Sequence, residues 1–76
     1  MDRETLQQHL KQTEEHIALN GKHLYEQRAL ISRLERHGRY DELTAAKELL
    51  AQLEEIGWLH LWDRDRLKRA LRELGQ

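Results

Sequence analysis

The feature that most constrains this chain is a seven-residue repeat of apolar side chains. In residues 3–38 one series of positions, which we call the apolar seam, is hydrophobic throughout: Leu10, Ile17, Leu24 and Ile31. A second series, which we call the polar seam, is hydrophobic only at its ends: Leu6, Thr13, Asn20, Gln27 and Leu34. Positions that alternate by three and four residues share one face of an α-helix. The repeat therefore predicts a helix over about 3–37.

The repeat resumes after a short interruption. Gly38 follows cationic residues and can take the left-handed conformation that ends a helix, and Asp41 is a typical N-cap. A turn over about 38–40 then separates the first helix from a second one over about 41–74. The second helix carries two seams with apolar ends: Leu43, Leu50, Gly57, Arg64 and Leu71, and Ala46, Leu53, His60, Leu67 and Leu74. A link this short predicts an antiparallel, coiled-coil-like hairpin of class all-α, forming a single domain over 1–76.

Composition supports the helical interpretation and limits what else can hold the fold together. There is no proline to break a helix and no cysteine for a disulfide or a thiolate metal site. A chain of 76 residues buries little apolar surface alone. We therefore expect a homodimer, in which two hairpins form a four-helix bundle.

Charge and motif content exclude several classes of function. The formal net charge is −1, although 36% of the residues are charged, so no global field favours nucleic acid. The longest uncharged run, residues 56–62, is far shorter than the ~20 residues that span a bilayer, and the first residues lack the order of a signal peptide. No phosphate loop or catalytic motif is present. The sequence predicts a cytoplasmic, non-enzymatic protein without a required cofactor or membrane contact.

Histidines form a stripe at the position that precedes the apolar seam. The stripe consists of His9, His16, His23 and His37, with Leu30 in the remaining place. It could bind metal between chains or respond to protons at an interface, because imidazole titrates near neutral pH. The alternative is a polar flank of a coiled-coil seam.

Folding the chain about residue 39 brings residues whose numbers add to about 78 to one level. His16 then lies near His60 and Asp63, a ligand set that would suit zinc with one open position. A hydrogen bond between His60 and Asp63 is the structural alternative. The same register sets Gly21 opposite Gly57, where the two backbones could approach closely.

Two tryptophans lie four residues apart on the second helix. Trp58 and Trp62 face away from the first helix in this seam assignment, and Leu19 and Leu30 also lie outside the seams. Paired aromatic anchors of this kind are typical of protein interfaces. We expect these four residues, together with His9, His16 and His23, to form an interface with a second chain or another protein. A rotated seam, with the tryptophans covering the core, is the alternative.

The C-terminal segment, residues 63–72, holds five basic and two acidic residues and suggests a third function, RNA binding by the hairpin. Cations near a helix C-terminus are also expected without any ligand.

Several short runs along the chain resemble a group of short, uncharacterised bacterial helical-hairpin proteins. The runs are residues 15–18, Gly21, His23, residues 27–28, 30–31 and 34–35, and then 59–60 with 63–67. The resemblance implies the hairpin fold and brings no activity, ligand or catalytic residue. The functional hypotheses therefore come from the residues: a self-associating interaction module first, a metal-binding bundle and an RNA-binding hairpin as alternatives.

Overall fold

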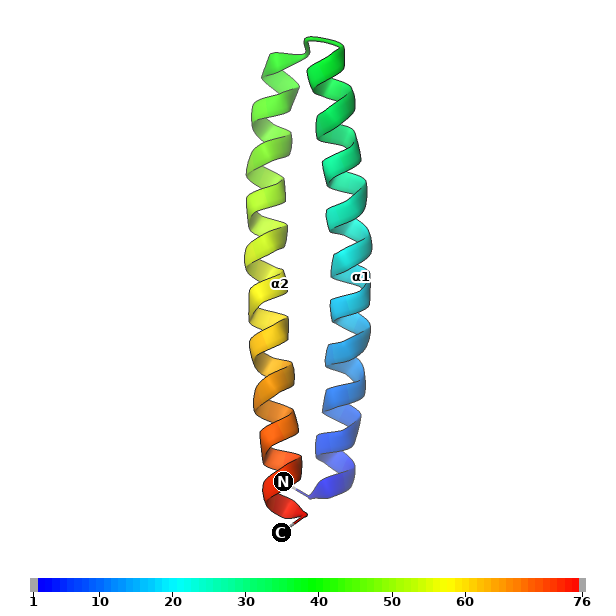
Figure 1. Ribbon diagram of the computed structural model, residues 1–76, viewed down its shortest axis with the longest axis vertical. Helices are drawn as coiled ribbons and strands as arrows, with labels where there is room; N and C mark the ends of the chain where they lie inside the picture. Colours follow the sequence, from blue (N-terminus) through cyan, green and yellow to red (C-terminus); the bar gives the residue numbers. More distant parts are fainter. Residues whose placement is uncertain (1, 76) are drawn as a thin grey trace.

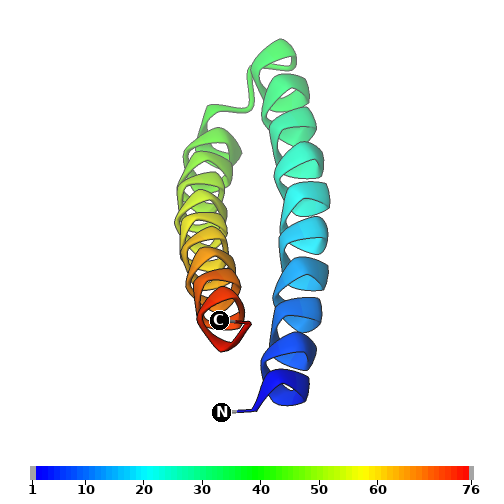
Figure 2. The same ribbon diagram turned by 60° about the horizontal axis from the view of Figure 1, so that its bottom comes forward.

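The computed structural model describes residues 2–75 and contains two helices, α1 (Arg3–Arg36) and α2 (Tyr40–Leu74). The helices pack side by side and antiparallel along their whole length (Figures 1 and 2). They form a rod of 57 × 14 × 13 Å between Cα atoms. The predicted all-α hairpin is confirmed, and the helix bounds lie within one residue of the expected ones.

The turn between the helices is closed by backbone hydrogen bonds around Gly38. The N–H of Arg39 donates to the carbonyl of Leu34 at 3.0 Å, and the N–H of Gly38 donates to that of Glu35 at 3.3 Å. This pair of bonds is the Schellman motif, which requires a left-handed residue after the helix. Gly38 supplies it with φ of 67°. The glycine therefore ends α1 as predicted.

The start of α2 differs from the expectation. Arg39, and not Asp41, occupies the N-cap position, and the Arg39 side chain makes no capping hydrogen bond. Asp41 lies inside the first turn beside Glu42. Both carboxylates still lie near the positive N-terminal end of the helix dipole, where a negative charge is stabilising. This interaction explains acidic residues at this position although neither of them caps the helix.

A side-chain cap is found at the other helix start. Asp2 precedes α1 in extended conformation, and its Oδ1 accepts a hydrogen bond of 2.8 Å from the N–H of Thr5. This bond satisfies one of the free donors of the first turn. It also lowers the pKa of Asp2, because the backbone donor stabilises the charged form.

The polar seam of α1, and not the apolar seam, lies at the centre of the helix interface. All five of its members are buried: Leu6, Thr13, Asn20, Gln27 and Leu34. In the apolar seam only Ile31 is buried, and Leu10, Ile17 and Leu24 are half-buried. The helix pair is therefore rotated so that the more hydrophobic stripe lies along one edge of the interface.

Apolar packing is concentrated toward the ends of the rod. Next to the turn, a cluster of Ile31, Leu34, Leu43 and Ala46 is extended by Leu30 and Leu50. Near the opposite end, Leu6 and Leu67 are buried. The middle of the interface is polar, so the two-helix rod has no continuous hydrophobic core.

The molecule exposes more surface than a globular protein of its mass. Its accessible area is 6053 Å², whereas a folded monomer of this size exposes roughly 4,900 Å². Within residues 2–75, no helix has a stretch long and apolar enough to cross a membrane.

The Asp2 cap generates a prediction about acid. The depressed pKa means that the cap stabilises α1 fully above the unfolded value of about 3.9 and loses this effect as the pH falls through the lower folded value. We expect the Thr5 amide resonance in NMR spectra to titrate with a midpoint below that value. Asp2→Asn keeps a capping oxygen and should abolish the titration. A midpoint at or above the unfolded value would contradict the cap.

Candidate functional site

Polar side chains of α1 cross the interface and donate to the backbone of α2. The amide Nε2 of Gln27 donates to the carbonyl of Ala46 at 2.9 Å, and Nδ2 of Asn20 donates to that of Leu53 at 3.1 Å. Donors and acceptors are both seven residues apart, so the two bonds repeat one geometry. No buried side-chain polar atom in the described residues lacks a partner. The sequence indicates these bonds only through two side-chain amides, Asn20 and Gln27, that lie seven residues apart in one seam. Their acceptors are backbone carbonyls, which the sequence does not identify.

A glycine makes room for one of these amides. A Cβ added at Gly57 would lie 2.6 Å from Oδ1 of Asn20, far inside a normal contact, whereas one added at Gly21 would meet nothing within 4 Å. The expected pairing of Gly21 with Gly57 is therefore wrong by one residue. Asn20 faces Gly57, because the amide needs the space left by the missing side chain. Gly21 has no reason within the chain to be glycine.

A pair of histidines lies on the opposite side of the interface. The rings of His16 in α1 and His60 in α2 are 5.3 Å apart between centroids and inclined by 44°. His16 is exposed and His60 is half-buried. The structure thus brings these two candidate ligands together from different helices.

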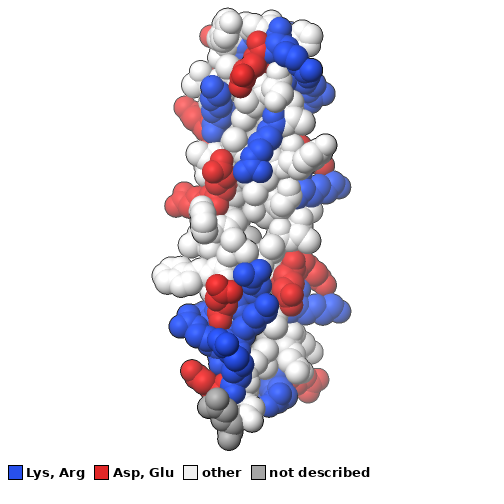
Figure 3. Space-filling view, viewed as in Figure 1, with Lys and Arg blue, Asp and Glu red and all other residues white. Residues whose placement is uncertain are grey.

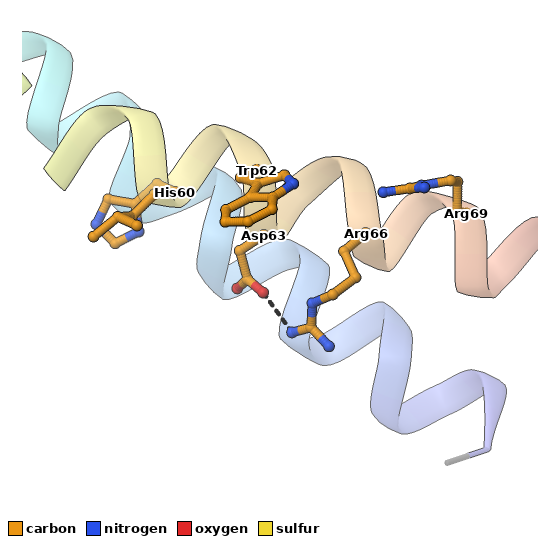
Figure 4. A pocket seen from close by; sticks show the side chains of 6 residues that line it. His60, Trp62, Asp63, Arg66 and Arg69 are labelled. Carbon is orange, nitrogen blue, oxygen red and sulfur yellow. Dashed lines mark hydrogen bonds and ion pairs between the residues drawn. The ribbon is translucent and has the colours of Figure 1, made fainter. Parts of the chain in front are cut away.

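The third candidate ligand, Asp63, is engaged elsewhere. Its carboxylate forms an ion pair with the guanidinium of Arg66 and accepts a hydrogen bond of 3.3 Å from Oγ1 of Thr13. Figure 4 shows this side chain turned toward Arg66. The Arg66 hydrogen bond lowers the pKa of Asp63, with smaller contributions from Thr13 and His60. Among residues 2–75 no group of three or more His, Cys, Asp or Glu side chains is arranged to hold a metal ion.

The other histidines of the stripe stand apart from this pair. His23 and His37 are exposed, and His9 is half-buried. His37 is the C-cap residue of α1, and its backbone N–H donates to the Arg33 carbonyl at 3.1 Å. Leu30 interrupts the stripe, and of its histidines only His16 lies against another histidine ring within the described residues.

The predicted apolar anchors differ in exposure. Trp58 and Trp62 are 72% and 70% exposed, and Leu19 is 51% exposed. Leu30 is half-buried and packs against the cluster near the turn. The tryptophans do not cover the core. Trp62 lines a shallow hollow of about 540 Å³ on α2 together with His60, Asp63 and the arginines of Figure 4.

Part of the basic charge near the end of α2 is already neutralised. Arg66 pairs with Asp63, and Arg64 pairs with Asp65 at 3.2 Å. Blue side chains gather toward the lower end of the face in Figure 3, but red ones lie beside them. This mixed surface gives RNA binding no support beyond that of the sequence.

Comparison of the chain with protein-family models, with curated proteins and with solved structures gives no match. The resemblance to bacterial hairpin proteins stays a prediction. The functional hypotheses depend on the geometry of the two candidate sites.

The Asn20–Gly57 contact predicts a thermodynamic coupling. Replacing glycine by alanine inside a helix stabilises it by ~1 kcal/mol when space allows. Gly57→Ala should give this gain in an Asn20→Ala background. In the parent protein the new methyl displaces the Asn20 amide and its hydrogen bond, which is worth about 1 kcal/mol, so the gain should disappear. Urea denaturation of the four proteins at one concentration measures the coupling, and equal effects of Gly57→Ala in both backgrounds would disprove the contact.

Proposed function

We propose that this chain is a non-enzymatic interaction module that self-associates, with two hairpins forming a four-helix bundle. The observation that carries the proposal is the large apolar surface left outside the helix pair. Within the described residues nine large hydrophobic side chains are exposed, among them Trp58, Trp62 and Leu59. Burial of apolar area stabilises association by roughly 25 cal/mol per Å², so a partner that covers some of these side chains is favoured.

The small internal interface gives the same proposal a second support. A two-helix rod has one interface, and here its middle is polar, with Thr13, Asn20 and Gln27 buried. Helices in proteins gain most of their stability from packing of an amphipathic face, because isolated helices are only marginally stable in water. A second hairpin would supply the missing layer for the half-buried apolar seam.

Self-association predicts that folding depends on protein concentration. We expect sedimentation equilibrium at roughly 1–100 µM to give about twice the chain mass of 9.2 kDa. The melting temperature should rise with concentration over the same range, because association stabilises only the folded chain. A fully helical monomer whose melting temperature is independent of concentration would refute the proposal.

The contact between His16 and His60 favours metal binding as a second candidate function. Two imidazoles on one tetrahedral zinc ion, with Zn–N bonds of about 2.0–2.1 Å, place their ring centroids roughly 5 Å apart. The observed separation of 5.3 Å fits this requirement. Asp63 lies one helical turn from His60 and could become a third ligand if it left Arg66.

Zinc titration tests this candidate and the role of Asp63 separately. We expect zinc to raise the melting temperature of the parent protein and His60→Ala to abolish that rise. Arg66→Ala frees the Asp63 carboxylate and should tighten zinc binding severalfold. Arg69→Ala, which removes an arginine of the same hollow that forms no ion pair within the described residues, is the matched control. Zinc stabilisation that survives His60→Ala would assign these histidines a purely structural role.

A further inference from the structure

One face of the rod carries half-buried apolar residues of both helices. We call it the glycine face; it consists of the exposed Gly21 and of seven half-buried residues, Leu10, Ile17, Leu24, Leu50, Gly57, Leu61 and Leu71. Arg64 lies in the same seven-residue series between Gly57 and Leu71 and pairs with Asp65 of its own chain. At its middle a groove of about 300 Å³ runs between the helices, lined by Gly21 and Gly57 with Trp58 at its rim.

We propose that the glycine face binds the same face of a second copy with the two turns at the same end of the bundle. The twofold axis then runs along the rod, and α1 of each copy lies against α2 of the other. This inference rests on the proposed self-association and specifies its geometry.

The area of the glycine face fits a second copy. The Cα atoms of the rod extend over 57 by 14 Å, a projected area of about 800 Å². This is comparable with the roughly 800 Å² of accessible surface that each partner buries in a standard stable interface. A second rod of equal length covers the whole face, whereas a smaller ligand would leave most of the apolar stripe exposed.

Gly21 provides an independent reason for close approach on this face. A glycine inside a helix costs ~1 kcal/mol relative to alanine, and a side chain at Gly21 would meet nothing in its own chain. Gly57 is explained by Asn20, but Gly21 is not. A neighbouring molecule that packs against the backbone at this level would need the space that the absence of a side chain leaves.

Charges on the outer edges of the face select between the two arrangements of a twofold dimer. Charged residues that lie seven or fourteen positions from Gly21 on α1, or from Leu61 on α2, form two edge rows. The α1 row is Glu14, Arg28 and Glu35, and the α2 row is Lys47, Glu54 and Lys68. Arg28 and Glu54 line the central groove with Gly21 and Leu61, which places both rows on this face. The ion pairs formed within residues 2–75 involve none of these six charges.

With the turns at the same end, the α1 row of one copy meets the α2 row of the other. Within the hairpin, residues at one level have numbers that add to 76–77, as for His16 with His60 and Asn20 with Gly57. Long side chains lean toward the N-terminus of their helix, which in antiparallel helices brings together pairs with a sum a few units higher. Every charged pair with a sum of 82 is complementary: Glu14–Lys68, Arg28–Glu54 and Glu35–Lys47.

The opposite arrangement, with turns at different ends, sets α2 beside α2. Lys47 and Lys68 lie about equally far from Gly57, which is at the middle of α2. Lys47 of one copy would therefore lie beside Lys68 of the other copy. Like charges at neighbouring positions are unfavourable. The opposite arrangement also sets Glu14 opposite Arg28, so its one repulsive pair is matched by one complementary pair, whereas turns at the same end make three pairs complementary. The charge pattern therefore favours turns at the same end.

Charge reversal in two complementary variants tests this geometry. Variant one carries Glu14→Lys, Arg28→Glu and Glu35→Lys; variant two carries Lys47→Glu, Glu54→Lys and Lys68→Glu. Each variant alone should dimerise at least roughly tenfold more weakly than the parent at low salt, because all six intermolecular pairs become repulsive. Mixed in equal amounts, the two variants should form a heterodimer as tight as the parent dimer. Sedimentation and native mass spectrometry measure both, and circular dichroism checks that each variant stays helical.

The outcomes separate this geometry from self-association itself. Parent-like dimers of both single variants would overturn the geometry and leave the proposed function intact, because turns at different ends keep Glu14 opposite Arg28 after reversal. Failure of the mixture to restore association would also overturn it, since the charges would then act within one chain. A monomeric parent protein would refute the geometry and the proposed function together.

Discussion

The hydrogen bonds from Asn20 and Gln27 to the backbone of α2 are the constraint on which the rest of the structure depends. Each amide is buried, and leaving a buried donor without a partner costs about 1–3 kcal/mol. Leucines in a seam can slide past each other with little penalty, but these amides must meet their acceptors. Because both bonds repeat at an interval of seven residues, a shift of one or two residues would break both at once. The polar seam thereby fixes the register of the hairpin.

The same bonds determine which face of the rod is apolar. To reach the carbonyls of α2, the polar seam has to lie at the centre of the interface, and this rotation moves Ile17 and Leu24 to its edge. Only near the turn, where the polar seam ends in Leu34, do both seams pack together. Polar contacts inside the hairpin and an apolar surface outside it are therefore two results of one rotation.

Sequence reasoning predicted the helices and the turn because the seven-residue repeat and Gly38 act locally. It placed His16 at the level of His60 because an antiparallel hairpin with a short turn has few registers. It did not predict the rotation of α1, since hydrophobicity favours the apolar seam at the centre and the acceptors of Asn20 and Gln27 are backbone atoms. The one-residue error in pairing Gly21 with Gly57 has the same origin, because the size of the Asn20 amide decides which residue faces the glycine.

The two candidate sites lie on different sides of the rod. Gly21 and His16 are five residues apart, which at 100° per residue places their side chains about 140° apart around α1. A metal ion held by His16 and His60 would therefore leave the glycine face free, and a second copy on the glycine face would leave the imidazoles open to solvent. Both helices contribute to each site, so both depend on the register that the buried amides set. A variant that shifts this register should disturb the two sites together, whereas a variant at either face should leave the other unchanged.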